Sequence, residues 1–335
     1  MNKKTAYFYK ERERQTKLLG TDLFDGATGG GYCMTDEGRK PFDFILKPED
    51  SVLNLYPSIR EDVLQYFERY DIAWWRQYED RYFPTGQAHS SQINCLNHLF
   101  AIRKDEDAVL QMIKPVGEAA GIHFDKILPS FIDTHEAYFD SAANKAVSNS
   151  NFISFEFVCH NIDLIDESHE KRGANCTSVD AFVYAQAGKE KWLIPIEWKY
   201  LEAYDHQLET NSYARYIRMP GERSRLSSWG DLYKVDPFYE LGRQTLLMER
   251  LIEKKPLVGK ISKKYPQHPL AADNFLHIVV IPEGNTEMRA DAVTFKESLR
   301  EDHREYFQIV SPDILMSPLE PKCPELINYL RRRYW

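Results

Sequence analysis

The sequence has few cysteines, no long apolar run and no apolar stretch near its amino terminus. Its 5 cysteines are an odd number, and no two of them form a CxxC pair. A disulfide framework is therefore not expected, and a reducing, cytoplasmic compartment fits this usage. A membrane-spanning helix needs about 20 consecutive apolar residues, and a secretory signal needs an apolar stretch behind a basic start. We expect neither feature in this chain.

Negative charge outweighs positive charge, and the common short motifs of enzymes are missing. The chain carries 43 Lys and Arg against 51 Asp and Glu, a formal net charge of −8. This balance argues against a protein that coats nucleic acid through its overall field, although a local basic groove is compatible with it. No GxSxG, HExxH or GxGxxG motif occurs. The Gly-rich residues 25–33 lack the Gly-Lys-Ser/Thr ending of a phosphate-binding loop, so we interpret them as a flexible turn.

The apolar patterns predict a mixed α/β fold. Hydrophobic residues make up 43% of the 335 residues, enough for one large domain or two smaller ones. Residues 1–50 are expected to be irregular, and three helical patterns then follow to residue 121. From there the order is β-β-β-α-β-α-β, which predicts a mixed sheet flanked by helices. We therefore divide the chain into a mainly helical region, residues 1–120, and an α/β core, residues 121–335. The helical patterns lie at residues 58–75, 90–102 and 105–121, and the later elements at residues 151–160, 178–186, 192–200, 237–252, 274–284, 290–303 and 306–312.

Charged residues interrupt two of the predicted strands. If a hairpin turns near Gly188, Asp180 lies opposite Glu197 or Lys199, and directly opposed side chains share one face of the sheet. A shift of one residue would instead place Asp180 opposite Trp198, on the other face. Pro195 marks an edge strand or a bulge, and a bulge would produce such a shift. The sequence leaves both registers open.

Two carboxylates beside one lysine suit metal-assisted phosphodiester hydrolysis. Clustered anions repel unless a cation separates them, and carboxylate oxygens are ligands that Mg²⁺ prefers. A nearby ammonium can orient water and offset charge that develops on a phosphate. A buried ion-pair network without a catalytic role is the alternative that the same residues allow.

Asp180 is followed, after sixteen further residues, by Glu197-Trp198-Lys199, and the two parts lie on the two strands of the predicted hairpin. This pattern resembles the PD-(D/E)XK nuclease superfamily. The order of elements from residue 121 also resembles this restriction endonuclease-like fold, although Val179 stands where the family usually has Pro. The resemblance implies an Mg²⁺-dependent nuclease, with Mn²⁺ as a substitute, that hydrolyses DNA in restriction, defence or repair. It implies Asp180 and Glu197 as metal ligands and Lys199 as a catalytic residue. A homodimer is common among relatives that cut both strands.

The resemblance also suggests supporting residues. Glu156, an acid within an apolar strand, is the candidate third metal ligand, and Gln244 matches a catalytic Gln on the helix after the Glu-x-Lys strand. His89, Ser91 and Gln92 are candidates to face the cleft from an earlier helix. The candidate phosphate contacts are cations after the motif strand: Arg215, Arg218, Arg223, Arg225, Lys254 and Lys255.

Three other interpretations remain at this point. Cys159, His160, His169 and Cys176 lie close together in sequence, but their spacing does not match a zinc knuckle. Two carboxylates also serve sugar hydrolysis, although Lys199 and the order of elements favour a phosphodiester. The third interpretation is an inactive nuclease fold that binds nucleic acid or serves as a structural scaffold.

Overall fold

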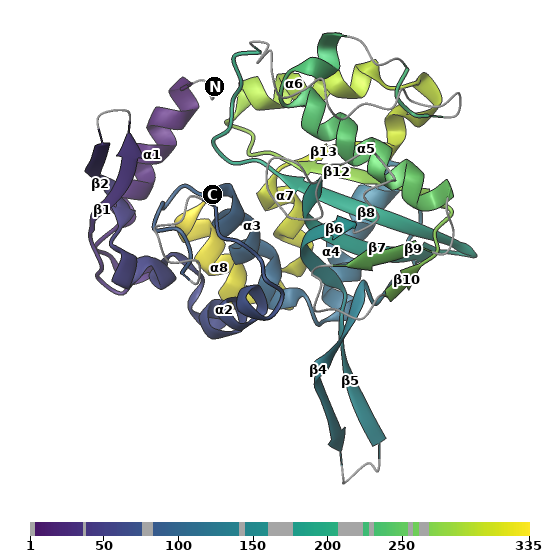
Figure 1. Ribbon diagram of the computed structural model, residues 1–335, viewed down its shortest axis with the longest axis horizontal. Helices are drawn as coiled ribbons and strands as arrows, with labels where there is room; N and C mark the ends of the chain where they lie inside the picture. The colour runs from purple at the N-terminus through teal and green to yellow at the C-terminus, as the bar shows by residue number, and fades with distance from the viewer. Residues whose placement is uncertain are drawn as a thin grey trace.

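A mixed β-sheet forms the centre of the molecule (Figure 1). The computed structural model describes residues 4–35, 38–75, 83–140, 145–159, 177–206, 224–227, 231–253, 257–260 and 268–335. Within these ranges the main sheet has nine strands, in the order β10-β9-β6-β7-β8-β12-β13, with β3 paired to β7 and β11 paired to β8. These strands are β3 (Lys126–Leu128), β6 (Ile153–Cys159), β7 (Ser178–Ala187), β8 (Glu190–Trp198), β9 (Leu257–Lys260), β10 (His268–Leu270), β11 (Asn274–Phe275), β12 (His277–Val280) and β13 (Phe307–Val310).

The β7–β8 hairpin adopts one of the two registers that the sequence left open. A two-residue turn joins the strands, and Gly188 adopts a φ of 60° there, which glycine tolerates best. The pairing runs without a shift from Ala187 and Glu190 to Ala181 and Ile196. One residue further along, this register sets Asp180 opposite Glu197.

Pro195 causes no bulge in the hairpin. It pairs with Phe182 inside the continuous ladder, and β8 is an interior strand rather than an edge strand. On the other side of β8, the parallel neighbours β11 and β12 share one register but are interrupted at Leu276. Because Pro195 has no N–H, it cannot donate to the neighbouring strand, which explains why the pairing of β8 with β11 and β12 is interrupted beside Pro195.

Two apolar cores cover the two faces of the sheet. One core contains Trp192, Ile194, Ile196 and Trp198 of β8, and the other contains Leu193. Figure 1 shows α5 and α6 on one side of the sheet, with α3, α4, α7 and α8 grouped away from them. The helices of the first core are α2 (Arg60–Arg69), α3 (Ser91–Leu99), α4 (Glu106–Ala119), α7 (Pro312–Met316) and α8 (Pro324–Arg333), and those of the second are α5 (Phe238–Glu253) and α6 (Thr286–Ser298).

The predicted mixed α/β fold with flanking helices is confirmed, and the helices expected near residues 58–75, 90–102 and 105–121 are present as α2, α3 and α4. The first core draws on residues from both sides of position 120. The proposed division into regions 1–120 and 121–335 stays a prediction. Over the described ranges, none of the helices combines the length and the apolar character needed to cross a membrane.

The prediction that residues 1–50 are irregular is wrong. Helix α1 (Ala6–Leu18) is followed by a hairpin of β1 (Gly29–Thr35) and β2 (Gly38–Leu46). Within the Gly-rich segment that we interpreted as a flexible turn, residues 25–26 do form a turn, but residues 29–33 belong to strand β1. Its glycines permit a close approach of the two strands, because a Cβ at Gly31 would lie 2.0 Å from the Leu46 carbonyl oxygen. Helix α1 escaped prediction because it buries Glu11 and Gln15 instead of an apolar stripe.

Two further features were not anticipated from the sequence. Strands β4 (Phe131–Asp140) and β5 (Lys145–Asn151) form a separate antiparallel hairpin, which extends away from the main sheet in Figure 1. Helix α8 ends with a buried arginine, Arg333, whose guanidinium donates to the Asn54 carbonyl oxygen at 2.7 Å and to the Tyr329 hydroxyl at 2.7 Å.

Candidate active site

Asp180 and Glu197 lie where the β7–β8 ladder ends. The Oδ2 atom of Asp180 accepts a hydrogen bond of 2.7 Å from the backbone N–H of Trp198. This bond ties the carboxylate of one strand to the residue between Glu197 and Lys199 on the next strand. Glu197 is buried at 3% exposure, whereas Asp180 is half-buried.

Lys199 contacts two carboxylates at once. Its Nζ lies 2.7 Å from Glu197 Oε1 and 2.5 Å from Glu240 Oε2. The side chains of Lys199 and Glu197 are 7% and 4% exposed, whereas that of Glu240 is 38% exposed. Glu197 and Lys199 therefore share a face of the sheet, as the period-two alternation predicts. Glu240 belongs to α5 and joins them from the neighbouring layer.

Gln244 holds Glu197 rather than Lys199. Its Nε2 donates to Glu197 Oε2 at 2.6 Å and to the Ser178 carbonyl oxygen at 2.9 Å. On its other side, His277 Nε2 lies 3.1 Å from Gln244 Oε1, which requires a protonated Nε2. Burial, together with the charge of Arg225, lowers the pKa of His277 to about 3, so this ring is neutral at pH 7. The imidazole thus fixes which end of the amide faces the carboxylate.

Glu156 lies beside Asp180 at an irregular position in β6. The pairs on either side of it, Phe155 with Ala181 and Phe157 with Val179, set it opposite Asp180. Its φ is 51°, in the left-handed region that non-glycine residues seldom occupy. As a result Phe155 joins one core and Phe157 joins the other. A strained backbone position of this kind often accompanies a functional site.

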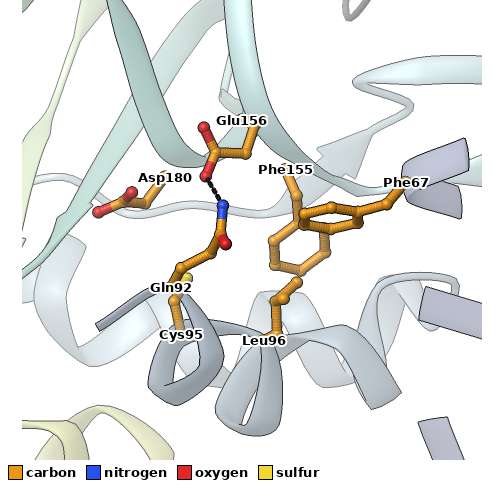
Figure 2. Close-up of a pocket in the computed structure, with 7 residues that line it drawn as sticks. All are labelled: Phe67, Gln92, Cys95, Leu96, Phe155, Glu156 and Asp180. Carbon is orange, nitrogen blue, oxygen red and sulfur yellow. Dashed lines mark hydrogen bonds between the residues drawn. The ribbon is translucent and has the colours of Figure 1, made fainter. Parts of the chain in front are cut away.

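A small pocket lies between β6, β7 and α3. Figure 2 shows the Glu156 carboxylate pointing toward Gln92, whose Nε2 donates to Glu156 Oε1 at 2.6 Å, with Asp180 on the other side of Glu156 from Phe155. Of the three residues proposed to face the cleft, Gln92 lines this pocket, whereas the His89 ring stacks on Phe44 at a centroid distance of 4.8 Å. Ser91 is the first residue of α3. The full lining is Phe67, Gln92, Cys95, Leu96, Phe155, Glu156 and Asp180.

Carboxyl groups outnumber cationic groups in this region. Burial and the charges of Glu197 and Glu156 raise the pKa of Asp180 well above its usual range. Burial and Glu240 raise the pKa of Glu197 to about 7, although Lys199 and Gln244 oppose the change. Burial alone would lower the pKa of Lys199, but Glu197 and Glu240 outweigh it and raise the pKa. The ammonium is therefore charged at neutral pH, and one lysine does not neutralise the surrounding acids.

The donor set fits Mg²⁺ in part. Asp180 and Glu197 offer hard oxygen ligands on neighbouring strands, and the excess of negative charge favours a cation. Across the part of the chain that the structure describes, however, no three His, Cys, Asp or Glu side chains are placed to hold one metal ion together. Glu156 is hydrogen-bonded to Gln92 instead. Because Mg²⁺ commonly keeps several waters and uses only one or two carboxylates, the pair Asp180 and Glu197 is chemically sufficient.

Most of the cations proposed for phosphate contacts lie outside the residues that the structure describes. Arg215, Arg218, Arg223, Lys254 and Lys255 lie outside the described residues, as do His160, His169 and Cys176 of the zinc alternative. Arg225 is described and is 5% exposed. Its guanidinium donates to the Phe275 carbonyl oxygen at 2.7 Å and lies 3.4 Å from the centre of the Phe275 ring. In this conformation Arg225 anchors the end of β11 and is not available to a phosphate.

Sequence reasoning missed three residues that contact the site. Glu240 binds Lys199, His277 orients Gln244, and Asn94 Oδ1 accepts from the Trp198 indole N–H at 2.9 Å. A signal existed for Glu240 alone, because it lies four residues before Gln244 and so on the same face of the predicted helix. His277 and Asn94 reach the site only through tertiary packing.

One family model matches this chain. The model described as "REase-ARP: Restriction Endonuclease associating with ARP" matches residues 26–335, nearly the whole chain. No curated protein and no solved structure matches the chain.

Proposed function

This chain belongs to the family of restriction endonucleases associating with ARP, and from that premise we propose that it is a metal-dependent nuclease that hydrolyses phosphodiester bonds in DNA. The observation that carries the proposal is the buried Glu197–Lys199 pair, with Nζ and Oε1 2.7 Å apart, next to Asp180 on the paired strand. Membership of the family supports a nuclease. The cation, the catalytic residues and the substrate are parts of our proposal, as is a role in restriction, defence or repair.

Asp180 and Glu197 are the proposed ligands of Mg²⁺ or Mn²⁺. When bound, the cation supplies positive charge to the scissile phosphate and makes a coordinated water more acidic. Gln244 holds one oxygen of Glu197 and so fixes the direction of its carboxylate. Glu156, opposite Asp180 on β6, is proposed to position a water beside the metal site.

Lys199 is the proposed catalytic cation. Its ammonium orients the attacking water and offsets the charge that develops on the phosphate oxygens. The water oxygen forms the new bond to phosphorus and loses a proton, the bond to the leaving oxygen breaks, and that oxygen takes up a proton, so that one water is added across the P–O bond. Arg215, Arg218, Arg223, Lys254 and Lys255 remain proposed phosphate contacts, which would make DNA affinity fall as salt rises. A homodimer, which would bring a second site to the opposite strand, also stays a prediction.

Plasmid cleavage with matched variants tests the proposal. Wild type is expected to cut DNA with Mg²⁺ or Mn²⁺ and to stop in EDTA, whereas Asp180→Asn and Lys199→Met are expected to lose at least about 100-fold in rate. Glu190→Gln, an exposed acid on the same strand as Glu197, is the control and should cut like wild type. Calorimetric titration with Mg²⁺ should give heat for wild type and Lys199→Met but not for Asp180→Asn. RNA and single-stranded DNA run in parallel determine the substrate class.

A catalytically inactive scaffold is the second candidate, and two observations favour it. Lys199 already has two carboxylate partners, and among the residues described no three-ligand metal group is formed. A scaffold would bind nucleic acid without cutting any of these substrates and would give no heat with Mg²⁺ or Mn²⁺. That combination of results would refute the nuclease.

A further inference from the structure

Two residues of α5 match Glu197 of β8 and Lys199, which directly follows the end of β8 at Trp198. Glu240 and Gln244 are four residues apart on the helix, a rise of about 6.0 Å. Glu197 and Lys199 are two residues apart in extended chain, a rise of about 6.6 Å. One helical turn therefore spans the same length as one strand repeat, so each helix residue can meet one strand residue.

The four side chains form two complementary contacts. The amide of Gln244 donates to Glu197 Oε2 at 2.6 Å, and the carboxylate of Glu240 accepts from Lys199 Nζ at 2.5 Å. Lys199 and Glu197 also contact each other at 2.7 Å, so the lysine is held from both layers. Glu240 differs from the other three residues because its side chain is 38% exposed, whereas those of Glu197 and Lys199 are 4% and 7% exposed and Gln244 is fully buried. Glu240 thus forms the outer boundary of the group.

We propose that Glu240 is a positioning residue that holds the Lys199 ammonium in its catalytic position while Glu197 ligates the cation. This inference rests on the proposed nuclease function. The reason is one of charge: a carboxylate that ligates a divalent ion has less charge to offer a neighbouring ammonium. Lys199 would then be repelled by the bound cation and would keep a strong partner only at Glu240. An ammonium on a four-carbon chain has many rotamers, so an anchor on the opposite side from Glu197 limits its motion.

Rate measurements on Glu240→Ala, Glu240→Gln and Glu240→Asp test this role. Glu240→Ala is expected to lower kcat between about 10- and 100-fold, with the KM for DNA and the Mg²⁺ affinity within about 2-fold of wild type, because positioning acts on the reacting geometry. Glu240→Gln keeps an oxygen acceptor but no charge and should fall between wild type and Glu240→Ala. Glu240→Asp should recover part of the loss. Glu253→Ala is the matched control, since Glu253 is an acid of the same helix that pairs with Arg250 at 2.6 Å.

Crystal structures of wild type and Glu240→Ala separate this inference from the nuclease proposal. The expected result is an ordered Lys199 Nζ between Glu197 and Glu240 in wild type, and a displaced or disordered Nζ in Glu240→Ala. An unchanged Lys199 in Glu240→Ala, or a kcat equal to that of wild type, would overturn the inference. If wild type neither binds metal nor cuts DNA, the nuclease proposal fails, and the position of Lys199 in the two crystals still decides whether Glu240 holds it.

Discussion

Removing the charge of Glu197 is expected to stabilise the metal-free protein at alkaline pH. Glu197 is 3% exposed and lies near Asp180 and Glu240, so its ionised form is disfavoured in the folded state. Glu197→Gln keeps the size of the side chain and an oxygen that can accept from Gln244. Lys199 keeps an anionic partner in Glu240, so the substitution does not leave an unpaired buried ammonium.

The magnitude follows from the pKa. Burial and Glu240 raise the pKa of Glu197 from 4.5 to about 7, and each unit corresponds to about 1.4 kcal/mol, so the ionised side chain costs the fold about 3 kcal/mol. Because the folded-state value is the higher one, the contribution of Glu197 to stability is fully present below pH 4.5. It is lost progressively as pH rises through about 7.

Denaturant unfolding in EDTA, from pH 5 to pH 8.5, measures this effect. The stability of Glu197→Gln relative to wild type is expected to rise across this range, by up to about 3 kcal/mol. Subtracting the two curves cancels the contributions of other titrating groups, and Glu190→Gln should track wild type throughout. A difference between wild type and Glu197→Gln that does not change with pH would refute the reasoning, because the charge would then be compensated in the fold.

Three further predictions concern stability. Gln244→Ala removes the donor to Glu197 and is expected to cost about 1–3 kcal/mol in the free energy of unfolding, measured by denaturant titration. Burial lowers the pKa of His98 to about 3, so the stability from this neutral ring is present above pH 6.5 and is lost as pH falls, by about 2 kcal/mol at pH 5. His98→Leu should therefore reduce the fall in the free energy of unfolding between pH 6.5 and pH 5. An unchanged fall would exclude the ring as its source. Gly31→Ala places a Cβ 2.0 Å from the Leu46 carbonyl oxygen. It should lower the free energy of unfolding by about 1–3 kcal/mol and so lower the melting temperature. An unchanged melting temperature would show that the hairpin shifts freely.

The sequence predicted the hairpin, because Gly188 fits a turn between two apolar strands, but it left two registers open. The structure has the register that sets Asp180 opposite Glu197. Pro195 was the reason for keeping the alternative register. The structure shows that the strand accommodates this proline without a bulge, because the neighbouring ladder is interrupted instead.

Other features were beyond sequence reasoning because they depend on distant packing. The left-handed backbone of Glu156 reverses which core its neighbours face, and no residue type near it signals such a change. Helix α1 buries polar side chains that join other parts of the chain, as when Gln15 Nε2 donates to the Arg333 carbonyl oxygen at 2.8 Å. An apolar pattern is therefore absent from α1, and periodicity could not reveal it.

The charge balance of the site argues for an ion rather than for a structural network. A network that only stabilises the fold should approach neutrality, because an unpaired buried charge is costly. Here Glu156 and Asp180 lie next to the Glu197–Lys199–Glu240 group, and burial together with repulsion between the acids raises the pKa of both Asp180 and Glu197. If the acids exist to hold a cation, Asp180→Asn should stabilise the protein in EDTA and also abolish the additional stability that Mg²⁺ gives to wild type. A structural network predicts the reverse, a loss of stability in Asp180→Asn and no effect of Mg²⁺ on either protein.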